Sequence, residues 1–280
     1  MVVNIMLKLT VLGNNGPYPA QGGACSGYLL QGDRATIVLD LGSGSLANLI
    51  SALSAELESI DAIILSHLHA DHISDISVLR YAVFRPNGAT DRDGAAKKIP
   101  LYCPAAPEQE YATLCSYGQF DVHPISEELT LDIRGLLVSF APMTHPYPVY
   151  AVSVRESAAA ARKDATDGDA AAARKFVYSG DTTWNQDIIL FAEDADLLLI
   201  DACFISQDRL SGHPPVHLTA EECGIIAGEA GVGKMLLTHF PPGGNVAQRV
   251  AEARAGVQKV LGRNDAVAVE ASKILTSYEV

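Results

Sequence analysis

The stretch SHLHADH, residues 66–72, places three imidazoles and a carboxylate directly after a four-residue apolar run. A short apolar run of this kind predicts a buried β-strand. As the chain leaves such a strand, the alternate residues His67 and His69 can point the same way, and Asp71 and His72 follow where the next helix begins. Two pairs of potential metal ligands would then face one place. Alone, a His-x-His motif predicts only a polar loop. A metal site therefore needs support from further histidines or acids elsewhere in the chain.

Three further apolar runs each lead to a histidine or an aspartate. The run LLVSFAPMTH ends at His145, KFVYSGD ends at Asp181, and KMLLTH ends at His239. In layered α/β proteins the loops at one end of a sheet converge, and ligand sites form there. A lone polar residue at a strand end is commonplace, but four such ends in one chain favour a shared site.

The ligand types predict two divalent metal ions. Imidazole and carboxylate ligands without thiolate suit zinc foremost, with manganese or iron as alternatives. Seven ligands are too many for one tetrahedral ion. We assign His67, His69 and His145 to one ion, Asp71, His72 and His239 to the other, and Asp181 as a bridge. Two ions about 3.5–4 Å apart can share a hydroxide, lower the pKa of water toward ~7, and hold the attacking and leaving oxygens of a displacement. The pattern therefore predicts a hydrolase.

The rest of the chain predicts one α/β domain spanning residues 1–280. With 280 residues and 48% apolar composition, the chain can build a sizeable core. The early strands could pair as an antiparallel meander, whereas the later part alternates strand and helix. The alanine-rich, charged stretch 155–175 predicts an exposed insertion between two strands. Strands are expected near 6–12, 27–31, 35–41, 61–65, 99–102, 135–141, 149–154, 175–179, 197–201, 234–238 and 266–269, and helices near 45–55, 74–84, 105–115, 184–193, 219–230 and 246–262.

Composition and charge exclude several classes of protein. The formal charge of −13 opposes long contacts with a phosphate backbone, so a large nucleic acid is a disfavoured partner. No apolar run is long enough to span a membrane, and the N-terminus lacks the basic start of a signal peptide, so a cytoplasmic protein is expected. The five cysteines contain no Cys-x-x-Cys pair, which argues against a disulfide framework or a thiolate zinc site.

Taken together, the motif His-x-His-x-Asp-His and the later His, Asp and His resemble the metallo-β-lactamase superfamily. VLDLGSG, residues 38–44, resembles the early strand and turn of that superfamily. The resemblance implies a four-layer αββα sandwich with the metals at one edge between the sheets. TVLGNNGPYPAQGGACSGYLL, SHLHADHISDISVL and the segment His217-Leu-Thr219 resemble the ribonuclease Z and cyclic phosphodiesterase branch.

That branch implies roles for two residues. His217 is a candidate general acid, or a contact for the phosphate in the transition state, and Asp71 is a candidate acceptor for the proton of the attacking water. A structural alternative is that His217 only precedes a helix that Thr219 caps, with Glu222 as the partner in a capping box. Both interpretations can hold at once.

A departure from the branch narrows the expected substrate. Members that process tRNA carry a long basic arm between the His and Asp ligands, but 181 − 145 leaves only 36 positions here. With the acidic balance of the chain, this favours a small phosphodiester, such as a cyclic nucleotide or a cyclic sugar phosphate. The alternatives are an RNA endonuclease of the ribonuclease Z type and a lactone or thioester hydrolase. Related enzymes are often homodimers, so a homodimer is also possible.

A different class of protein also has support in the sequence. Gly42, Gly44 and Ala47 form a G-x-G-x-x-A turn between a strand and a helix, with Asp61 further on, as in dinucleotide or S-adenosylmethionine sites. A transferase of that kind would leave the histidines without a role. A second alternative is a protein without enzymatic activity, in which these ligands bind one structural metal. Such a site is normally closed and four-coordinate.

Four further histidine, serine and threonine residues near these motifs have less central predicted roles. Ser179 and Thr182 flank Asp181 and could orient it. His213 could contact substrate, and His123 is expected in a turn before a proline.

Overall fold

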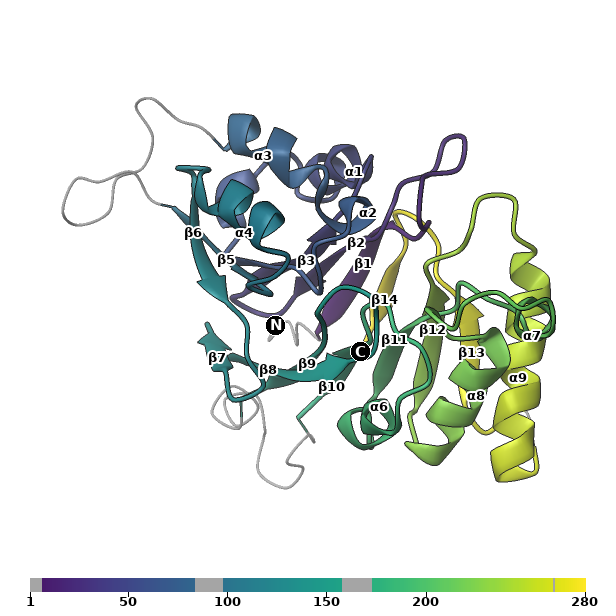
Figure 1. Ribbon diagram of the computed structural model, residues 1–280. Coiled ribbons are helices and arrows are strands. Elements are labelled where there is room, and N and C mark those ends of the chain that lie inside the picture. The colour runs from purple at the N-terminus through teal and green to yellow at the C-terminus, as the bar shows by residue number, and fades with distance from the viewer. Residues whose placement is uncertain (1–6, 84–97, 158–172, 264) are drawn as a thin grey trace, which may run out of the picture.

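The computed structural model describes residues 7–83, 98–157, 173–263 and 265–280. Two seven-stranded sheets lie face to face between layers of helices, which confirms the predicted four-layer αββα sandwich (Figure 1). The strands are β1 (Lys8–Gly13), β2 (Gly27–Gln31), β3 (Thr36–Leu41), β4 (Ala62–Ile64), β5 (Ile99–Cys103), β6 (Phe120–Pro124), β7 (Thr130–Ile133), β8 (Leu136–Met143), β9 (Val149–Glu156), β10 (Lys175–Tyr178), β11 (Leu197–Asp201), β12 (Lys234–Thr238), β13 (Ala268–Ala271) and β14 (Ser277–Glu279). The helices are α1 (Ser45–Ala52), α2 (Ala70–Ile73), α3 (Ile76–Ala82), α4 (Glu108–Cys115), α6 (Gln186–Phe191), α7 (Ser206–Leu210), α8 (Ala220–Glu229) and α9 (Val246–Leu261), with the 3-10 turn η1 (Leu57–Ser59).

The two sheets follow the same plan. Their strand orders are β14-β1-β2-β3-β4-β5-β6 and β13-β12-β11-β10-β9-β8-β7. In the first sheet β1 to β3 pair antiparallel and β3 to β6 pair parallel. In the second sheet β8 to β10 pair antiparallel and β10 to β13 pair parallel. The predicted early meander is therefore right only as far as β3, because the later connections run through helices and restore the strand direction.

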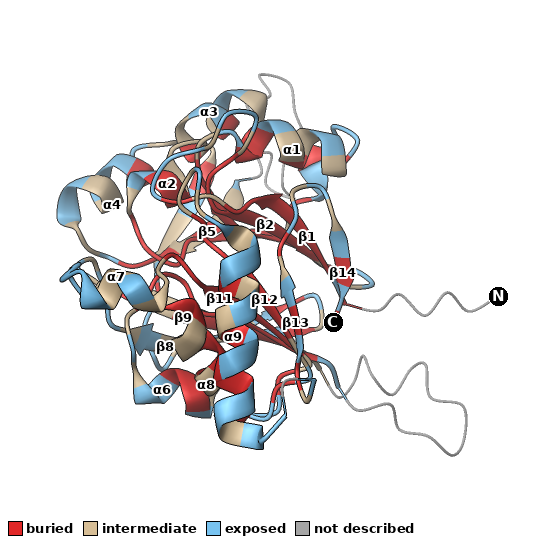
Figure 2. Ribbon diagram, turned by 90° about the vertical axis from the view of Figure 1, so that its right-hand side faces the viewer, coloured by how far each residue is buried: buried red, intermediate tan, exposed pale blue. Residues whose placement is uncertain are grey.

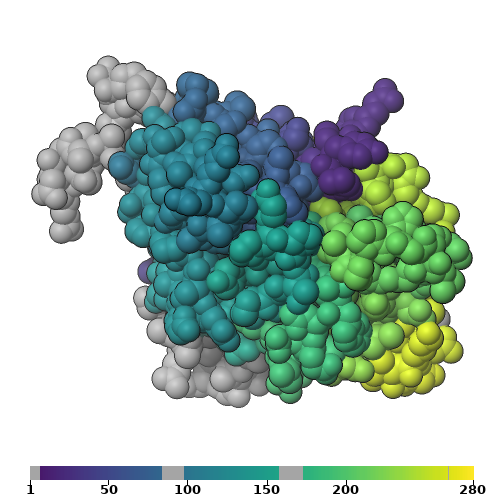
Figure 3. Space-filling view, viewed as in Figure 1, coloured from purple at the N-terminus to yellow at the C-terminus, as the bar shows by residue number. Residues whose placement is uncertain are grey.

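Three apolar clusters hold the four layers together. The central cluster joins the inner faces of both sheets and includes Tyr28 of β2 and Tyr178 of β10. A second packs α6, α8 and α9 against the outer face of the second sheet, and a third packs α1, α3 and α4 against the first sheet. The strands are accordingly buried, while the helices expose their outer faces (Figure 2). The space-filling view shows the halves of the chain lying side by side (Figure 3).

Most of the predicted elements are present, and the errors are informative. The strands predicted from long apolar runs are all found within a few residues, but β6, β7 and β14 were not predicted, because they are partly exposed strands with few apolar residues. His123 lies in β6, stacked on Tyr102, so its predicted turn is wrong. The antiparallel strands β9 and β10 flank the predicted insertion, whose residues 158–172 lie outside the described part. No helix of the described residues is long and apolar enough to cross a membrane.

Candidate metal centre

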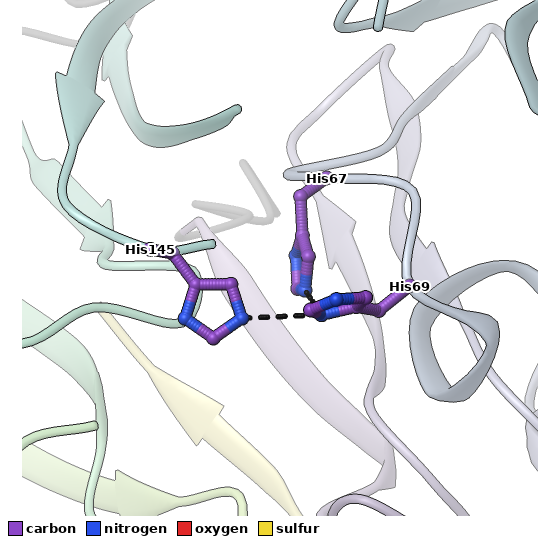
Figure 4. Close-up of side chains that lie close together, drawn as sticks. All are labelled: His67, His69 and His145. Atoms are coloured by element: carbon purple, nitrogen blue, oxygen red, sulfur yellow. Dashed lines mark hydrogen bonds between the residues drawn. The ribbon is translucent and has the colours of Figure 1, made fainter. Parts of the chain in front are cut away.

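The first predicted ligand set comes together in space. His67 and His69 lie on the loop between β4 and α2, and His145 follows β8, so the three rings come together from two segments of the chain (Figure 4). His69 Nδ1 lies 3.0 Å from His67 Nε2 and 3.1 Å from His145 Nε2. Burial, together with the neighbouring imidazoles, lowers the pKa of all three histidines. They are therefore held in the neutral form that binds metals.

The second predicted set lies beside the first. The ligand atoms of Asp71, His72, Asp181 and His239 all lie within 4.8 Å of one another. His239 Nε2 is 3.1 Å from Asp71 Oδ2 and 3.2 Å from Asp181 Oδ2. Asp181 lies near members of both sets, since its Oδ1 is 3.4 Å from His72 Nε2 and its Oδ2 is 3.8 Å from His67 Nε2. This position suits the bridging role predicted for it.

The donor set fits cations. His72 Nε2 and Asp181 Oδ1 are buried and have no hydrogen-bond partner among the described residues. Orphaned polar atoms of this kind cost free energy unless a ligand meets them. Burial alone would raise the pKa of Asp181, but His239, His72 and His67 hold it well below its usual range. A deprotonated carboxylate facing unpartnered imidazole nitrogens is an arrangement that divalent ions stabilise.

Asp40, at the end of β3, fixes the orientation of His72. Its carboxylate accepts hydrogen bonds from Ser66 N at 2.7 Å, Ser66 Oγ at 2.8 Å, His72 Nδ1 at 2.8 Å and Tyr178 Oη at 2.8 Å. Because Nδ1 of His72 donates to Asp40, Nε2 is left free to face Asp181. Asp40 also has a φ of 51°, an uncommon backbone conformation for a residue other than glycine. The sequence prediction assigned Asp40 no bonding role, although a buried acid at the end of an apolar strand is the signal that could have found it.

His217 is held next to the ligands by Asp201. His217 Nδ1 donates to Asp201 Oδ2 at 2.8 Å, and its ring stacks 5.0 Å from that of His239. Burial by itself would lower the pKa of His217, but Asp201 outweighs it and raises this pKa to about 9. The predicted capping box is also confirmed, since Thr219 and Glu222 exchange hydrogen bonds at the start of α8. His217 is therefore both a loop residue before a capped helix and a neighbour of the predicted metal ligand His239.

Several neighbouring residues behave differently from their predictions. Ser179 and Thr182 do not bond to Asp181, because Ser179 Oγ accepts from the backbone of Asp201 and Thr182 N donates to the carboxylate of Asp201. They therefore support the acid that holds His217. His213 is exposed and bonds to the carbonyl of Asp208, with no contact to the predicted ligands among its described interactions.

A cysteine that sequence reasoning missed also lies at the site. The thiol of Cys203 belongs to a group with His217 and His239 whose ligand atoms lie within 4.8 Å of one another. Burial and then Asp201 raise the pKa of this thiol far above neutrality. Cys203 was not among the predicted ligands, and its buried thiol lies beside His217 and His239.

The N-terminal loop lies against His239. Gly16 N donates to Phe240 O at 3.1 Å, and Phe240 N donates to Asn14 O at 2.8 Å. A Cβ atom added at Gly16 would lie only 1.9 Å from His239 Nε2. His239 itself has a φ of 60°, so its ring is held in place by a constrained backbone and by this loop.

The glycine turn of the competing dinucleotide motif has a structural role. A Cβ at Gly42 would lie 1.8 Å from the carbonyl oxygen of Asp71, so this glycine permits α2 to approach β3 closely. At the start of α1, Leu46 N donates to Asp75 Oδ2 at 2.9 Å. The helix N-terminus, where a cofactor pyrophosphate would bind, already faces a carboxylate of the chain itself.

The chain is similar to proteins of the beta-lactamase superfamily in both sequence and structure. A family model described as a beta-lactamase superfamily domain matches residues 21–240. The probable metallo-hydrolase YhfI of Bacillus subtilis is 32% identical over 235 residues, which cover 84% of this chain and 87% of that protein. The crystal structure of YhfI, a metallo-beta-lactamase fold protein, has a TM-score of 0.78 at 30% identity and covers 99% of this chain and 100% of its own.

Two more distant proteins have similar sequences or folds. A ribonuclease Z of Ignicoccus hospitalis is 24% identical over 275 residues, which cover 83% of this chain and 87% of that protein. A crystal structure of a diphosphatase from the PhnP family has a TM-score of 0.68 at 18% identity and covers 98% of both chains.

The contact between Gly16 and His239 predicts that Gly16→Ala weakens metal binding. The added methyl group must displace the His239 ring, so we expect affinity for the second metal to fall about 10- to 100-fold. The measurement is metal content after dialysis against graded chelator. Gly118→Ala is the matched control, because a Cβ there meets nothing within 4 Å. Unchanged metal affinity in Gly16→Ala would contradict this role of the loop.

The bonds of Asp40 predict a large loss of stability in Asp40→Ala. The variant leaves Ser66, His72 and Tyr178 without their buried acceptor, so the free energy of unfolding should fall by about 3–5 kcal/mol. Tyr178→Phe removes a single bond and should cost about 1 kcal/mol. Both values come from urea unfolding of the chelated protein. Equal stability of Asp40→Ala and the wild type would refute the assignment.

Proposed function

The chain belongs to the metallo-β-lactamase superfamily and is a metallo-hydrolase of that fold, and we propose that it hydrolyses a small phosphodiester with two bound zinc ions. The observation that carries the proposal is the position of Asp181 between two ligand sets, with the half-buried His217 and its buried partner Asp201 beside them. Imidazole and carboxylate donors favour zinc, with manganese or iron as alternatives.

When bound, two such ions would activate a water molecule and stabilise negative charge on the phosphate. The remaining chemistry belongs to side chains of the chain itself. Asp71 is 8% exposed, and its carboxylate faces the centre next to His239, where it can accept the proton of the attacking water. As the water oxygen bonds to phosphorus and the bond to the departing oxygen breaks, His217 donates a proton to that oxygen. Because Asp201 holds Nδ1 of His217, Nε2 is the nitrogen that donates.

Two features support a small phosphodiester over other substrates. Two of the similar proteins are a ribonuclease Z and a diphosphatase, whose names denote hydrolysis of bonds to phosphorus. The formal charge of −13 disfavours a long nucleic acid. We therefore place a cyclic nucleotide or cyclic sugar phosphate before RNA, and a lactone or thioester after both.

The proposal predicts metal-dependent cleavage of bis(p-nitrophenyl) phosphate. Activity should disappear on chelation and return with zinc or manganese, since the activated water depends on the ions. A panel of cyclic nucleotides, cyclic sugar phosphates, precursor tRNA, lactones and thioesters then identifies the class of substrate. Activity in a verified metal-free protein would refute the proposal, as would cleavage of lactones or thioesters alone.

The role of His217 predicts a specific kinetic defect. His217→Ala should keep both metals and lower kcat for a diester with a strongly basic leaving group by about a hundredfold or more, because general acid catalysis contributes at that level. His213→Ala is the control, since His213 is exposed and bonds only to the carbonyl of Asp208 among the hydrogen bonds of the described residues. An unchanged kcat in His217→Ala would leave His217 with only the structural role before α8.

A further inference from the structure

We propose that Arg209, on the short helix α7, is a positioning residue that holds His217 in place for proton donation. The inference rests on the proposed function, because it concerns the step in which His217 protonates the departing oxygen. Arg209 does not touch the metal ligands in any contact of the described residues, and its effect would pass entirely through His217.

The guanidinium of Arg209 joins three segments that meet at His217. Its Nη2 donates to the backbone carbonyl of His217 at 2.7 Å. The same nitrogen donates to Glu222 Oε2 at 3.2 Å and to Thr183 Oγ1 at 3.3 Å. Glu222 belongs to α8, and Thr183 belongs to the loop after Asp181. One side chain therefore connects α7 to α8, to the loop that carries His217 and to the loop that carries Thr183.

These bonds complete a set of restraints on the His217 ring. Asp201 fixes Nδ1 of the ring at 2.8 Å, and Arg209 binds the backbone carbonyl of the same residue at 2.7 Å. The ring of Phe204 packs edge-on against His217 with centroids 5.3 Å apart, and the Arg209 guanidinium lies 5.8 Å from the Phe204 ring. Arg209 therefore supports both the backbone of His217 and an aromatic residue that packs against its ring.

The charge of the Arg209 guanidinium is paired with the carboxylate of Glu222. Glu222 Oε2 also accepts from Thr219 N at 2.7 Å, so the pair of Arg209 and Glu222 ties the capping box of α8 to the His217 carbonyl. The side chains of Arg209 and Glu222 are 23% and 25% exposed, and partial burial strengthens such a pair relative to one in open solvent. All three bonds come from Nη2, whereas Nη1 is buried and has no partner among the described residues. A lysine, which offers one cationic donor group, can therefore replace part of this function.

The expected consequence depends on the leaving group. Proton donation matters most when the departing oxygen is strongly basic, and a displaced donor of about 1 Å can cost 10²-fold in rate. Arg209→Met should thus lower kcat by about 10- to 100-fold for a phenyl diester and far less for a p-nitrophenyl diester. KM should change little, since Arg209 contacts no substrate in this scheme. Arg209→Lys should recover a large part of the loss.

The experiment compares these variants of the full-length protein over a series of aryl diesters of increasing leaving-group pKa. Arg254→Met is the matched control, because Arg254 donates to the backbone carbonyl of Val269, away from His217. A double-mutant cycle adds His217→Ala, in which Arg209→Met should cause no further loss. Equal losses for all leaving groups, or losses that add to those of His217→Ala, would overturn the inference.

A second readout does not depend on activity. In protein labelled with ¹⁵N-histidine, the ring signals of His217, assigned with His217→Ala, should shift in Arg209→Met and stay unchanged in Arg254→Met. Unmoved His217 signals in Arg209→Met would overturn the inference even if no diester were cleaved. Absence of diesterase activity in the wild type together with shifted signals would count against the proposed function alone.

Discussion

The buried carboxylate of Asp40 is the contact on which the geometry of the centre depends. It lies at the end of β3 in the first sheet and accepts hydrogen bonds from the loop before α2, from His72 and from Tyr178 in the second sheet. Tyr28 adds a second polar link between the sheets through Thr238 at 2.7 Å. In a low-dielectric interior these bonds are strong and their loss is costly. The relative position of the sheets is therefore tied to the orientation of a predicted metal ligand.

The charge of the interior explains why metals belong there. Four carboxylates at the centre are at most 8% exposed, namely Asp40, Asp71, Asp181 and Asp201. Divalent cations bound beside these carboxylates, together with a protonated His217, would offset this negative charge. Buried charges without such compensation shift their pKa or destabilise the fold. Such cations would also meet the unpartnered atoms of His72 and Asp181.

The common plan of the two sheets brings the residues together. In each sheet an antiparallel part changes to a parallel part, at β3 and at β10. The ends of β3 and β11 and the loops that follow β4, β8, β10 and β12 supply acids and imidazoles of the centre. In layered α/β proteins, ligand sites form where the loops at one end of the sheets converge. The outer helices α7, α8 and α9 then fix these loops: Arg209 binds the carbonyl of His217, and Arg249 binds those of Ala202 and Cys203. A hydrolytic centre is thus supported from its core side by Asp40 and from its outer side by arginines.

The sequence by itself determined the fold class, the strands with long apolar runs, and the residues that gather at the centre. The mixed α/β class and the strands follow from local patterns, since an apolar run predicts a strand and the next polar residue lies at its end. The four-layer sandwich was implied by the resemblance of the motifs to the metallo-β-lactamase superfamily. Only the tertiary structure decided which groups bond to one another. It assigned Ser179 and Thr182 to Asp201, placed Gly16 against His239, and connected Arg209 to His217. Such contacts can join residues far apart in the chain, as with Asp40 and Tyr178, which are 138 positions apart, and no local pattern records the partner of a polar side chain. The partners exist because burial leaves each polar group only the neighbours that the packed sheets bring to it.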